Sequence, residues 1–494
     1  MRRRGGWVHQ GDRGHGRGER GWVWRALLAL LVVAVVAGAV VAWQLDLAGR
    51  LADDSPTADA SAEASAGPAD VPPPAGLELP PLTDPAPVAA PLTAPGPIDA
   101  ALVKAAVRPV LADPVLGPHV VGAVVDLATG RPVVKLGGGG PAIPASTTKL
   151  LTATAALSVL GPETRFATRV LSGGKNRVVL VGGGDPFLAS KPVPSAYPAH
   201  ADVETLAAQV AASLRAEGRS RVRLAYDDSL FSEPSFNPAW PAHYLPEHVV
   251  SRITALWVDE GRPATGSGRV DDPSLYAAQT FAAALTAQGI TVVGTPKHGV
   301  ASEGRELGRV ESAPLREIAA RILEVSDNEG AEVLSHQVGL AVTGTASFAD
   351  GAAAVTQTLA KLGVPMRGVS IHDGSGLSRD NLITPLALVG VLRVALDPAH
   401  PELDPIATAL PVAGFTGSLT NRFDQPFPES RGLVRAKTGT LTNVSSLAGV
   451  AVDQDGNQML FALMADRIKK PDETKAQHAL DAAAGALGAC HCGG

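Results

Sequence analysis

The chain has 494 residues, which is long enough for two or three domains with ample hydrophobic core. Its formal net charge is −6, but the charge is uneven: residues 1–25 hold seven arginines against Asp12 and Glu19. The rest of the chain is therefore acidic, which argues against nucleic acid as a partner.

An apolar run at residues 26–43 follows the basic head at residues 1–25. About 18 apolar residues just suffice for a membrane-spanning helix, and an arginine-rich flank predicts a cytoplasmic N-terminus. The alternative is a cleaved signal peptide, because Ala37-Gly38-Ala39 resembles a small-residue cleavage site. We favour a single-pass anchor in the cell membrane. Both interpretations place the rest of the chain outside the cytoplasm.

Residues 44–98 are rich in alanine and proline, with scattered acidic residues. Such a segment cannot bury enough apolar surface to fold, so it predicts an extended linker between the anchor and the domain that follows.

The next stretch predicts a β-hairpin and then a helix that carries a candidate nucleophile. Residues 119–126 and 132–136 alternate around a Thr129-Gly130 turn, and a helix is expected to begin near Ser146 and to end at Gly161. Ser146 and Lys149 would share one helical face. A serine hydroxyl needs a base to become a nucleophile, and a lysine of lowered pKa can be that base.

A serine and a lysine three residues apart are a weak signal on their own, and the same spacing recurs at Ser172 and Lys175. Two glycines between these residues favour a turn rather than a helix there. Ser146 therefore needs independent support from the rest of the chain.

Residues 165–255 predict one inserted α/β lobe, with strands at 177–181 and 221–226 and a helix at 203–217. The glycine runs at 137–140 and 182–184 lack nucleotide-loop spacing, so we expect no cofactor.

Three helices follow, at residues 274–288, 314–325 and 329–341, and Ser326-Asp327-Asn328 interrupts the last two. On a short connection between helices, Ser326 and Asn328 can both point into one cleft. The alternative is an ordinary helix N-cap.

A strand with the sequence Lys437-Thr438-Gly439-Thr440 comes next, followed by a hairpin at residues 446–465. Lys437, Thr438 and Thr440 could bind a carboxylate, and Gly439 would let a peptide approach closely and pair with the strand. The alternative is an ordinary edge strand.

The chain has two cysteines, Cys490 and Cys492, within the tail at residues 488–494. We expect no disulfide framework and no metal site, because ligands bunched in a tail make a poor one. The tail predicts a frayed end with no catalytic part.

The three polar motifs stand in the order shared by penicillin-recognising serine enzymes: Ser146-x-x-Lys149, Ser326-Asp327-Asn328 and Lys437-Thr438-Gly439. With the pieces GGGDP, YDDSLF, SDNEGAE, DGSGLS and RAKTGTL, residues 100–487 resemble the class C penicillin-binding proteins. These are the D-alanyl-D-alanine carboxypeptidases/endopeptidases of peptidase family S13.

The resemblance implies hydrolysis of the terminal D-Ala-D-Ala bond of peptidoglycan stem peptides, and possibly of cross-links, with covalent inhibition by β-lactams. Ser146 would be the acylated nucleophile, Lys149 its base, and Ser326 a proton relay to the leaving amine. Asn328 would hold a substrate amide, and Lys437, Thr438 and Thr440 the terminal carboxylate. The backbone N–H groups of Ser146 and Thr440 would form the oxyanion hole.

The implied fold is α+β: an antiparallel sheet flanked by helices, a helical subdomain and one inserted lobe. Residues 99–164 and 256–487 would form the catalytic domain. The insert looks shorter than in larger members of the family, which usually carry two extra lobes.

Two other functions share these motifs. A β-lactamase would need fast deacylation, but residues 327–436 hold no Glu-x-x-x-Asn element of the class A kind. A non-catalytic protein that binds the cell wall or senses β-lactams is the second alternative, and the complete set of polar motif residues argues against it.

Overall fold

A computed structural model describes residues 97–265 and 267–493. The predicted basic head, anchor and most of the linker lie outside these residues. In the part of the chain that is described, no single helix is long and apolar enough to cross a membrane. Helices α7 (Asn328–Thr343) and α8 (Phe348–Lys361) satisfy the length and composition only as a pair bent by 72°.

The first sheet has five strands in the order β2-β1-β11-β10-β9, and every neighbouring pair is antiparallel. Its strands are β1 (Val120–Asp126), β2 (Pro132–Leu136), β9 (Val434–Leu441), β10 (Val444–Val452) and β11 (Gln458–Ala465). The predicted hairpin and the predicted C-terminal strands are therefore confirmed. Strand β11 lies at the centre of the sheet, between β1 of the N-terminal hairpin and β10.

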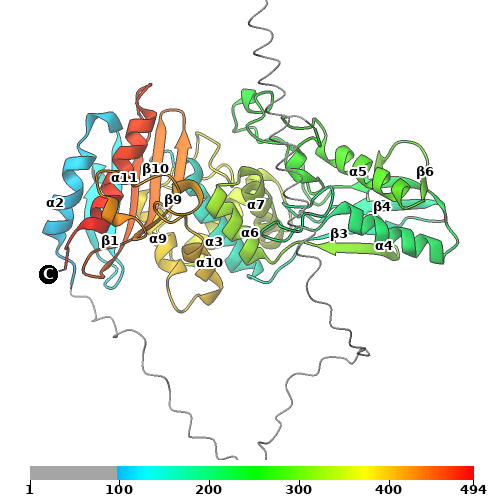
Figure 1. Ribbon diagram of the computed structural model, residues 1–494, viewed down its shortest axis with the longest axis horizontal. Coiled ribbons are helices and arrows are strands. Elements are labelled where there is room, and N and C mark those ends of the chain that lie inside the picture. The colour runs from blue at the N-terminus through cyan, green and yellow to red at the C-terminus, as the bar shows by residue number, and fades with distance from the viewer. Residues whose placement is uncertain (1–96, 266, 494) are drawn as a thin grey trace, which may run out of the picture. The chain divides into compact units, whose positions relative to one another are not determined.

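Helices cover both faces of this sheet because its central strand is apolar on both sides. Along β11, Phe461 and Leu463 pack with α2 (Ala100–Leu111) and α11 (Glu473–Ala489). The alternate residues Leu460 and Met464 pack with the remaining helices of this part of the chain. Those helices are α3 (Thr148–Leu160), α6 (Leu315–Val325), α7, α8, α9 (Pro385–Ala395) and α10 (Asp404–Thr408) (Figure 1).

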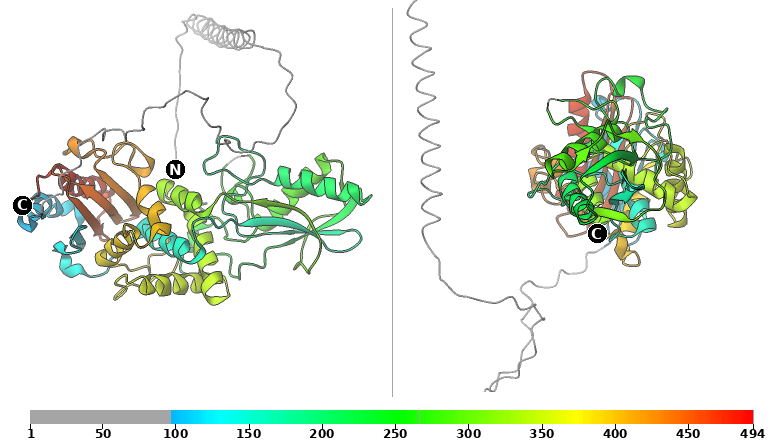
Figure 2. Two further views of the ribbon diagram at one scale, coloured as in Figure 1. Left: turned by 90° about the horizontal axis from the view of Figure 1, so that it is seen from below. Right: turned by 90° about the vertical axis from the view of Figure 1, so that its right-hand side faces the viewer.

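The second sheet has six strands and forms the inserted lobe. Its strands are β3 (Ala167–Ser172), β4 (Arg177–Val181), β5 (Arg221–Asp227), β6 (Thr291–Val292), β7 (Lys297–His298) and β8 (Glu306–Glu311). The pairing is mixed, since β3 is antiparallel to β4 and β8, whereas β5 is parallel to β4, β6 and β7. Helices α4 (Val203–Ala216) and α5 (Pro273–Ala287) share its apolar core (Figure 1 and Figure 2).

The predicted end of the lobe at residue 255 is wrong. The chain leaves the second sheet after β5, and its Trp240 and Trp257 pack with Phe348 of α8. It then returns through α5 to strands β6–β8, and β8 closes the sheet against β3. The alanine-rich pattern of α5 fits packing on either sheet, so the sequence alone could not assign it to the lobe.

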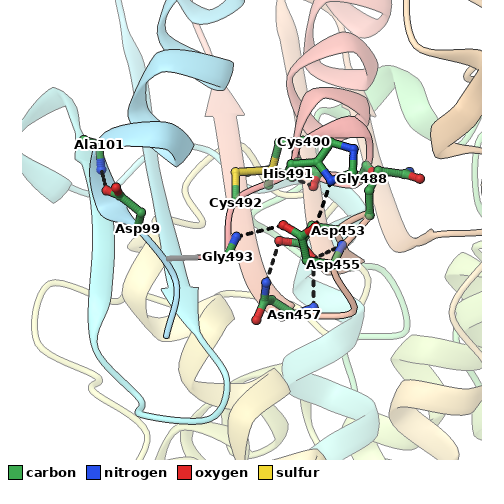
Figure 3. Close-up of a disulfide and its surroundings, with 12 residues drawn as sticks. Asp99, Ala101, Asp453, Asp455, Asn457, Gly488, Cys490, His491, Cys492 and Gly493 are labelled. Atoms are coloured by element: carbon green, nitrogen blue, oxygen red, sulfur yellow. Dashed lines mark hydrogen bonds and ion pairs between the residues drawn. A yellow bond between two sulfur atoms is a disulfide. The ribbon is translucent and has the colours of Figure 1, made fainter. Parts of the chain in front are cut away.

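The C-terminal tail is not frayed, contrary to the prediction. Cys490 and Cys492 form a disulfide, and Cys492 is fully buried (Figure 3). The Cys492 carbonyl accepts from the N–H of Asp99 at 2.9 Å, and Asp455 accepts from the N–H of Gly493 at 3.0 Å. The tail therefore joins the start of α2 to the β10–β11 turn. The carboxylate of Asp453 lies near both sulfurs, but neither is a free thiolate that could bind a metal.

Candidate active site

Ser146 lies in a single 3₁₀ turn, Ala145–Thr147, immediately before α3. The hydroxyl groups of Thr147 and Thr148 donate to the carbonyls of Pro144 and Ala145 at 2.8 and 2.9 Å. Strand β9 passes so close that a Cβ on Gly439 would lie 2.5 Å from the Pro144 oxygen and 3.1 Å from the Ser146 nitrogen. A glycine is therefore required at 439, and the Ser146 N–H lies beside β9.

Lys149 is fully buried on the first turn of α3 and contacts three oxygen atoms. Its Nζ lies 2.9 Å from Ser146 Oγ, 2.7 Å from Asn328 Oδ1 and 2.7 Å from the Ser375 carbonyl oxygen. A neutral amine can donate to the amide and carbonyl oxygens and accept from the Ser146 hydroxyl. The predicted pairing of Ser146 with Lys149 is therefore present in the structure.

Ser326 and Asn328 lie on the connection between α6 and α7, as the sequence predicted. Ser326 ends α6 with φ +64° in the left-handed region, and Asp327 caps α7 by accepting from the N–H of Gly330 at 2.7 Å. The turn sends Asn328 towards Lys149 and Ser326 towards Lys437. The predicted N-cap is thus real, but it belongs to Asp327.

Lys437 is the fully buried lysine of β9, and its Nζ donates to Ser326 Oγ at 2.8 Å and to the Thr438 carbonyl at 3.0 Å. Thr438 is also buried, with its hydroxyl 2.9 Å from that of Ser418. Thr440 is exposed at the rim, where its hydroxyl accepts from Gln477 at 3.3 Å. The three motifs therefore meet through two lysine contacts, Lys149 with Asn328 and Lys437 with Ser326.

Burial lowers the pKa of Lys149 to about 8, against the smaller opposing effects of Asp327, Asp373, Glu332 and Glu329. The lowered pKa that a lysine base requires is therefore present, and burial is its main cause. Burial also lowers the pKa of Lys437, and the positive charge of Lys149 acts in the same direction.

Two buried carboxylates that the sequence did not single out hold the turn that contacts Lys149. Glu332 accepts from the N–H groups of Gly374 and Ser375, the latter at 2.7 Å. Asp373 accepts from the N–H groups of Gly376 and Ser378 and from side chains outside the turn. The glycine and serine content of residues 373–378 predicted a turn, but not that its Ser375 carbonyl would face the lysine.

A serine hydroxyl in contact with a buried lysine is the arrangement expected of one class of protein, the serine acyl-transfer enzymes. The chain also matches the family model described as "D-Ala-D-Ala carboxypeptidase 3 (S13) family" over residues 103–266 and 261–487. These segments cover well over half of the sequence. The chain therefore belongs to peptidase family S13, the serine-type D-Ala-D-Ala carboxypeptidases, as its motifs predicted.

Individual relatives agree with this assignment. The chain is 35% identical over 405 residues to Carboxypeptidase Rv3627c of Mycobacterium tuberculosis, covering 80% of this chain and 85% of that protein. It is also 35% identical over 394 residues to Carboxypeptidase DacB of Mycolicibacterium smegmatis, covering 78% and 83%.

The crystal structure of penicillin-binding protein 4 (DacB) from Haemophilus influenzae has the same fold. The TM-score is 0.63 at 21% identity, covering 78% of this chain and 98% of that one. The same Haemophilus protein is also known in complex with a β-lactam, with a TM-score of 0.60 at 21% identity and coverage of 76% and 98%.

Proposed function

We propose that this member of family S13 hydrolyses the terminal D-Ala-D-Ala bond of peptidoglycan peptides through an acyl-enzyme on Ser146. The observation that carries the proposal is the position of Lys149, buried and in contact with both Ser146 and Asn328. Neutral Lys149 takes the hydroxyl proton while Ser146 Oγ attacks the carbonyl carbon of the scissile bond. The scissile C–N bond then breaks, D-alanine leaves with a proton on its amine, and water hydrolyses the ester that remains on Ser146 and restores the free serine.

The negative charge that develops on the carbonyl oxygen needs donors, and the N–H groups of Ser146 and Thr440 are the candidates. The close approach of β9 to the Ser146 nitrogen supports this pair. Ser326 would pass a proton to the leaving amine, and Asn328 would hold the amide on the acyl side of the scissile bond.

The carboxylate of the leaving D-alanine would lie against Lys437, Thr438 and Thr440. A carboxylate beside Lys437 favours the charged form of that lysine. The positive charge of the site would then reside on Lys437 in the substrate complex, and Lys149 would be the neutral amine.

β-Lactams would acylate Ser146 in the same way, as the β-lactam complex of the Haemophilus protein suggests. A fluorescent penicillin tests this directly. The label should persist for minutes and D-alanine should be released from defined muropeptides. Rapid loss of the label would favour a β-lactamase, and the absence of D-alanine release would favour a non-catalytic binding protein.

We also propose that residues 26–43 anchor the protein in the cell membrane, with the catalytic part outside the cytoplasm. The support is the apolar run behind an arginine-rich head in the sequence. Deletion of residues 1–45 should move the protein from the membrane fraction to the soluble fraction and leave its activity on small peptides unchanged. Retention in the membrane fraction would contradict the anchor.

A further inference from the structure

A cavity of about 820 Å³ extends from the second motif towards the inserted lobe. Ser326 and Asn328 line it on one side, and Tyr197, His200 and Arg262 line it on the lobe side. Because the two motif residues border both this cavity and the two lysines of the site, the cavity continues the active site.

Two of the three arginines in this cavity are already paired with carboxylates. Arg262 contacts Glu260 at 2.9 Å, and Arg269 contacts Glu329 at 2.5 Å. Among the residues that the structure describes, Arg321 of α6 has no carboxylate oxygen within 4.0 Å. Its guanidinium group, five residues before Ser326, therefore has no carboxylate partner in the described part of the chain.

The acidic residues that remain do not neutralise Arg321 through direct contact. Asp259 accepts instead from the N–H of Ser190 at 3.0 Å. Asp327 accepts from the N–H of Gly330 at 2.7 Å, and burial and the neighbouring Glu260 raise its pKa to about 8, which disfavours its charged form. The positive charge of Arg321 is felt inside the cavity, where it lowers the pKa of His200 together with the larger effect of burial.

We propose that this cavity is an extended substrate subsite in which Arg321 binds a carboxylate of the peptidoglycan peptide away from the scissile bond. The proposal rests on the proposed function. A planar guanidinium binds a carboxylate through two parallel hydrogen bonds, so it selects for an acid over an amide of the same shape. Peptidoglycan stem peptides offer such groups on their γ-linked glutamate and on a diamino acid.

The carboxylate has two possible sources. It could belong to the acyl-donor stem, upstream of the bond that is cut, or to the second strand of a cross-link, which leaves with the amine. Both sources have the same chemistry, but only the second would make the enzyme prefer cross-links over free pentapeptide ends.

The experiment compares the full chain with Arg321→Gln and Arg316→Gln. Arg316 lies on the same helix and pairs with the exposed Glu163 and with Glu317, outside the cavity. Each protein is given three substrates: a short acylated D-Ala-D-Ala peptide, a full pentapeptide stem and a cross-linked dimer. The last two are supplied with their other carboxylates either free or converted to carboxamides, while the carboxylate of the terminal D-alanine stays free in every form.

The wild type and Arg316→Gln should cleave the acid forms about tenfold or more faster than the amide forms in kcat/KM, a typical effect of one charged hydrogen-bonded pair. In Arg321→Gln this ratio should fall to about one. The short peptide and penicillin labelling should stay within about twofold of the wild type. A change with both long substrates assigns the donor stem, and a change with the dimer alone assigns the second strand.

Two results would overturn the inference. One is an unchanged acid-to-amide ratio in Arg321→Gln. The other is an equal loss on every substrate, including penicillin, which would show that Arg321 acts only through the fold. Failure of the proposed function looks different, since the wild type would then release no D-alanine from any substrate.

Discussion

The two sheets of this chain bury different kinds of side chain. The core shared by the lobe sheet, α4 and α5 consists of apolar residues. Around the first sheet, the fully buried groups include Lys149, Lys437 and Glu332, with Asp373 only 1% exposed. Burying a charge is costly unless hydrogen bonds satisfy it, and each of these four side chains has hydrogen-bond partners. Among the described residues, the titratable side chains with no exposed surface, Lys149, Lys437 and Glu332, therefore gather around the first sheet, whereas the buried acids of the lobe keep a few per cent of their surface exposed.

The largest effect is expected when one serine beside the first sheet is replaced and compared with the same replacement in the lobe. Ser146→Ala should abolish both penicillin labelling and D-alanine release, because it removes the proposed nucleophile. Ser172→Ala should leave both near the wild type, since Ser172 lies at the end of β3 in the lobe and its pattern with Lys175 is a coincidence of spacing. Labelling that persists in Ser146→Ala would place the nucleophile elsewhere.

The next largest effect is expected at the lysines of the same two patterns. Lys149→Arg should be acylated at least ~100-fold more slowly, the low end of what a positioned base contributes, because arginine keeps its proton. Lys175→Arg should have no effect. In the wild type, acylation should rise with pH through about 8, where buried Lys149 becomes neutral. Wild-type acylation rates in Lys149→Arg would mean that another residue is the base.

The sequence predicted which motif residues come together because each motif is local. Ser146 with Lys149, and Ser326 with Asn328, are each fixed by the geometry of one turn, and the strand pattern around Lys437 is clear. The contacts that support these motifs are not local. Glu332 accepts from the N–H of Ser375, and the carbonyl of Ser375 accepts from Lys149, so the acid acts on the lysine through the backbone of a distant turn. No periodicity encodes such a contact.

The limits of the fold prediction have the same cause. Elements were predicted nearly to the residue, as with α4 and β4, because hydrophobic period and turn residues are local signals. The assignment of α5 and β8 to the lobe depends on long-range pairing with β3, and the docking of the tail depends on Asp455 and Asp99. Neither contact leaves a pattern in its own segment.

Glu332→Gln should produce an intermediate effect. The amide oxygen of glutamine can accept from both N–H groups, as Oε1 of Glu332 does, but the amide nitrogen would then face the N–H of Gly374. This unfavourable contact should disturb the turn and shift the carbonyl that contacts Lys149. We expect acylation to slow about tenfold, within the range for a misplaced base. Burial raises the pKa of Glu332 itself to about 8, so its charge develops over the pH range in which Lys149 loses its proton and there raises the pKa of Lys149. Without that charge, the midpoint of the pH profile should move to lower pH.

The control for Glu332→Gln is a buried acid of the lobe. Asp202 caps α4 by accepting from the N–H of Thr205 at 2.7 Å, so Asp202→Ala should cost about 1 kcal/mol of stability. It should not move the pH profile of acylation. If the pH profile of Glu332→Gln is also unchanged, Glu332 only supports the structure and does not affect the pKa of Lys149.

The smallest effect concerns Asp185, which follows β4 and is a buried acid of the lobe, as Asp202 and Asp227 are. One of its carboxylate oxygens is buried and has no hydrogen-bond partner among the described residues, and burial raises its pKa from 3.8 to about 7. The folded state therefore holds this proton more tightly than the unfolded state, so ionisation should destabilise the protein as pH rises from about 4 to 7.

Asp185→Asn should have the melting temperature of the wild type at pH 4 and a melting temperature roughly 2–5 °C higher than the wild type at pH 8, with D-alanine release unchanged. Calorimetry at the two pH values measures the difference, and a gap that is the same at both would show that Asp185 does not titrate in this range.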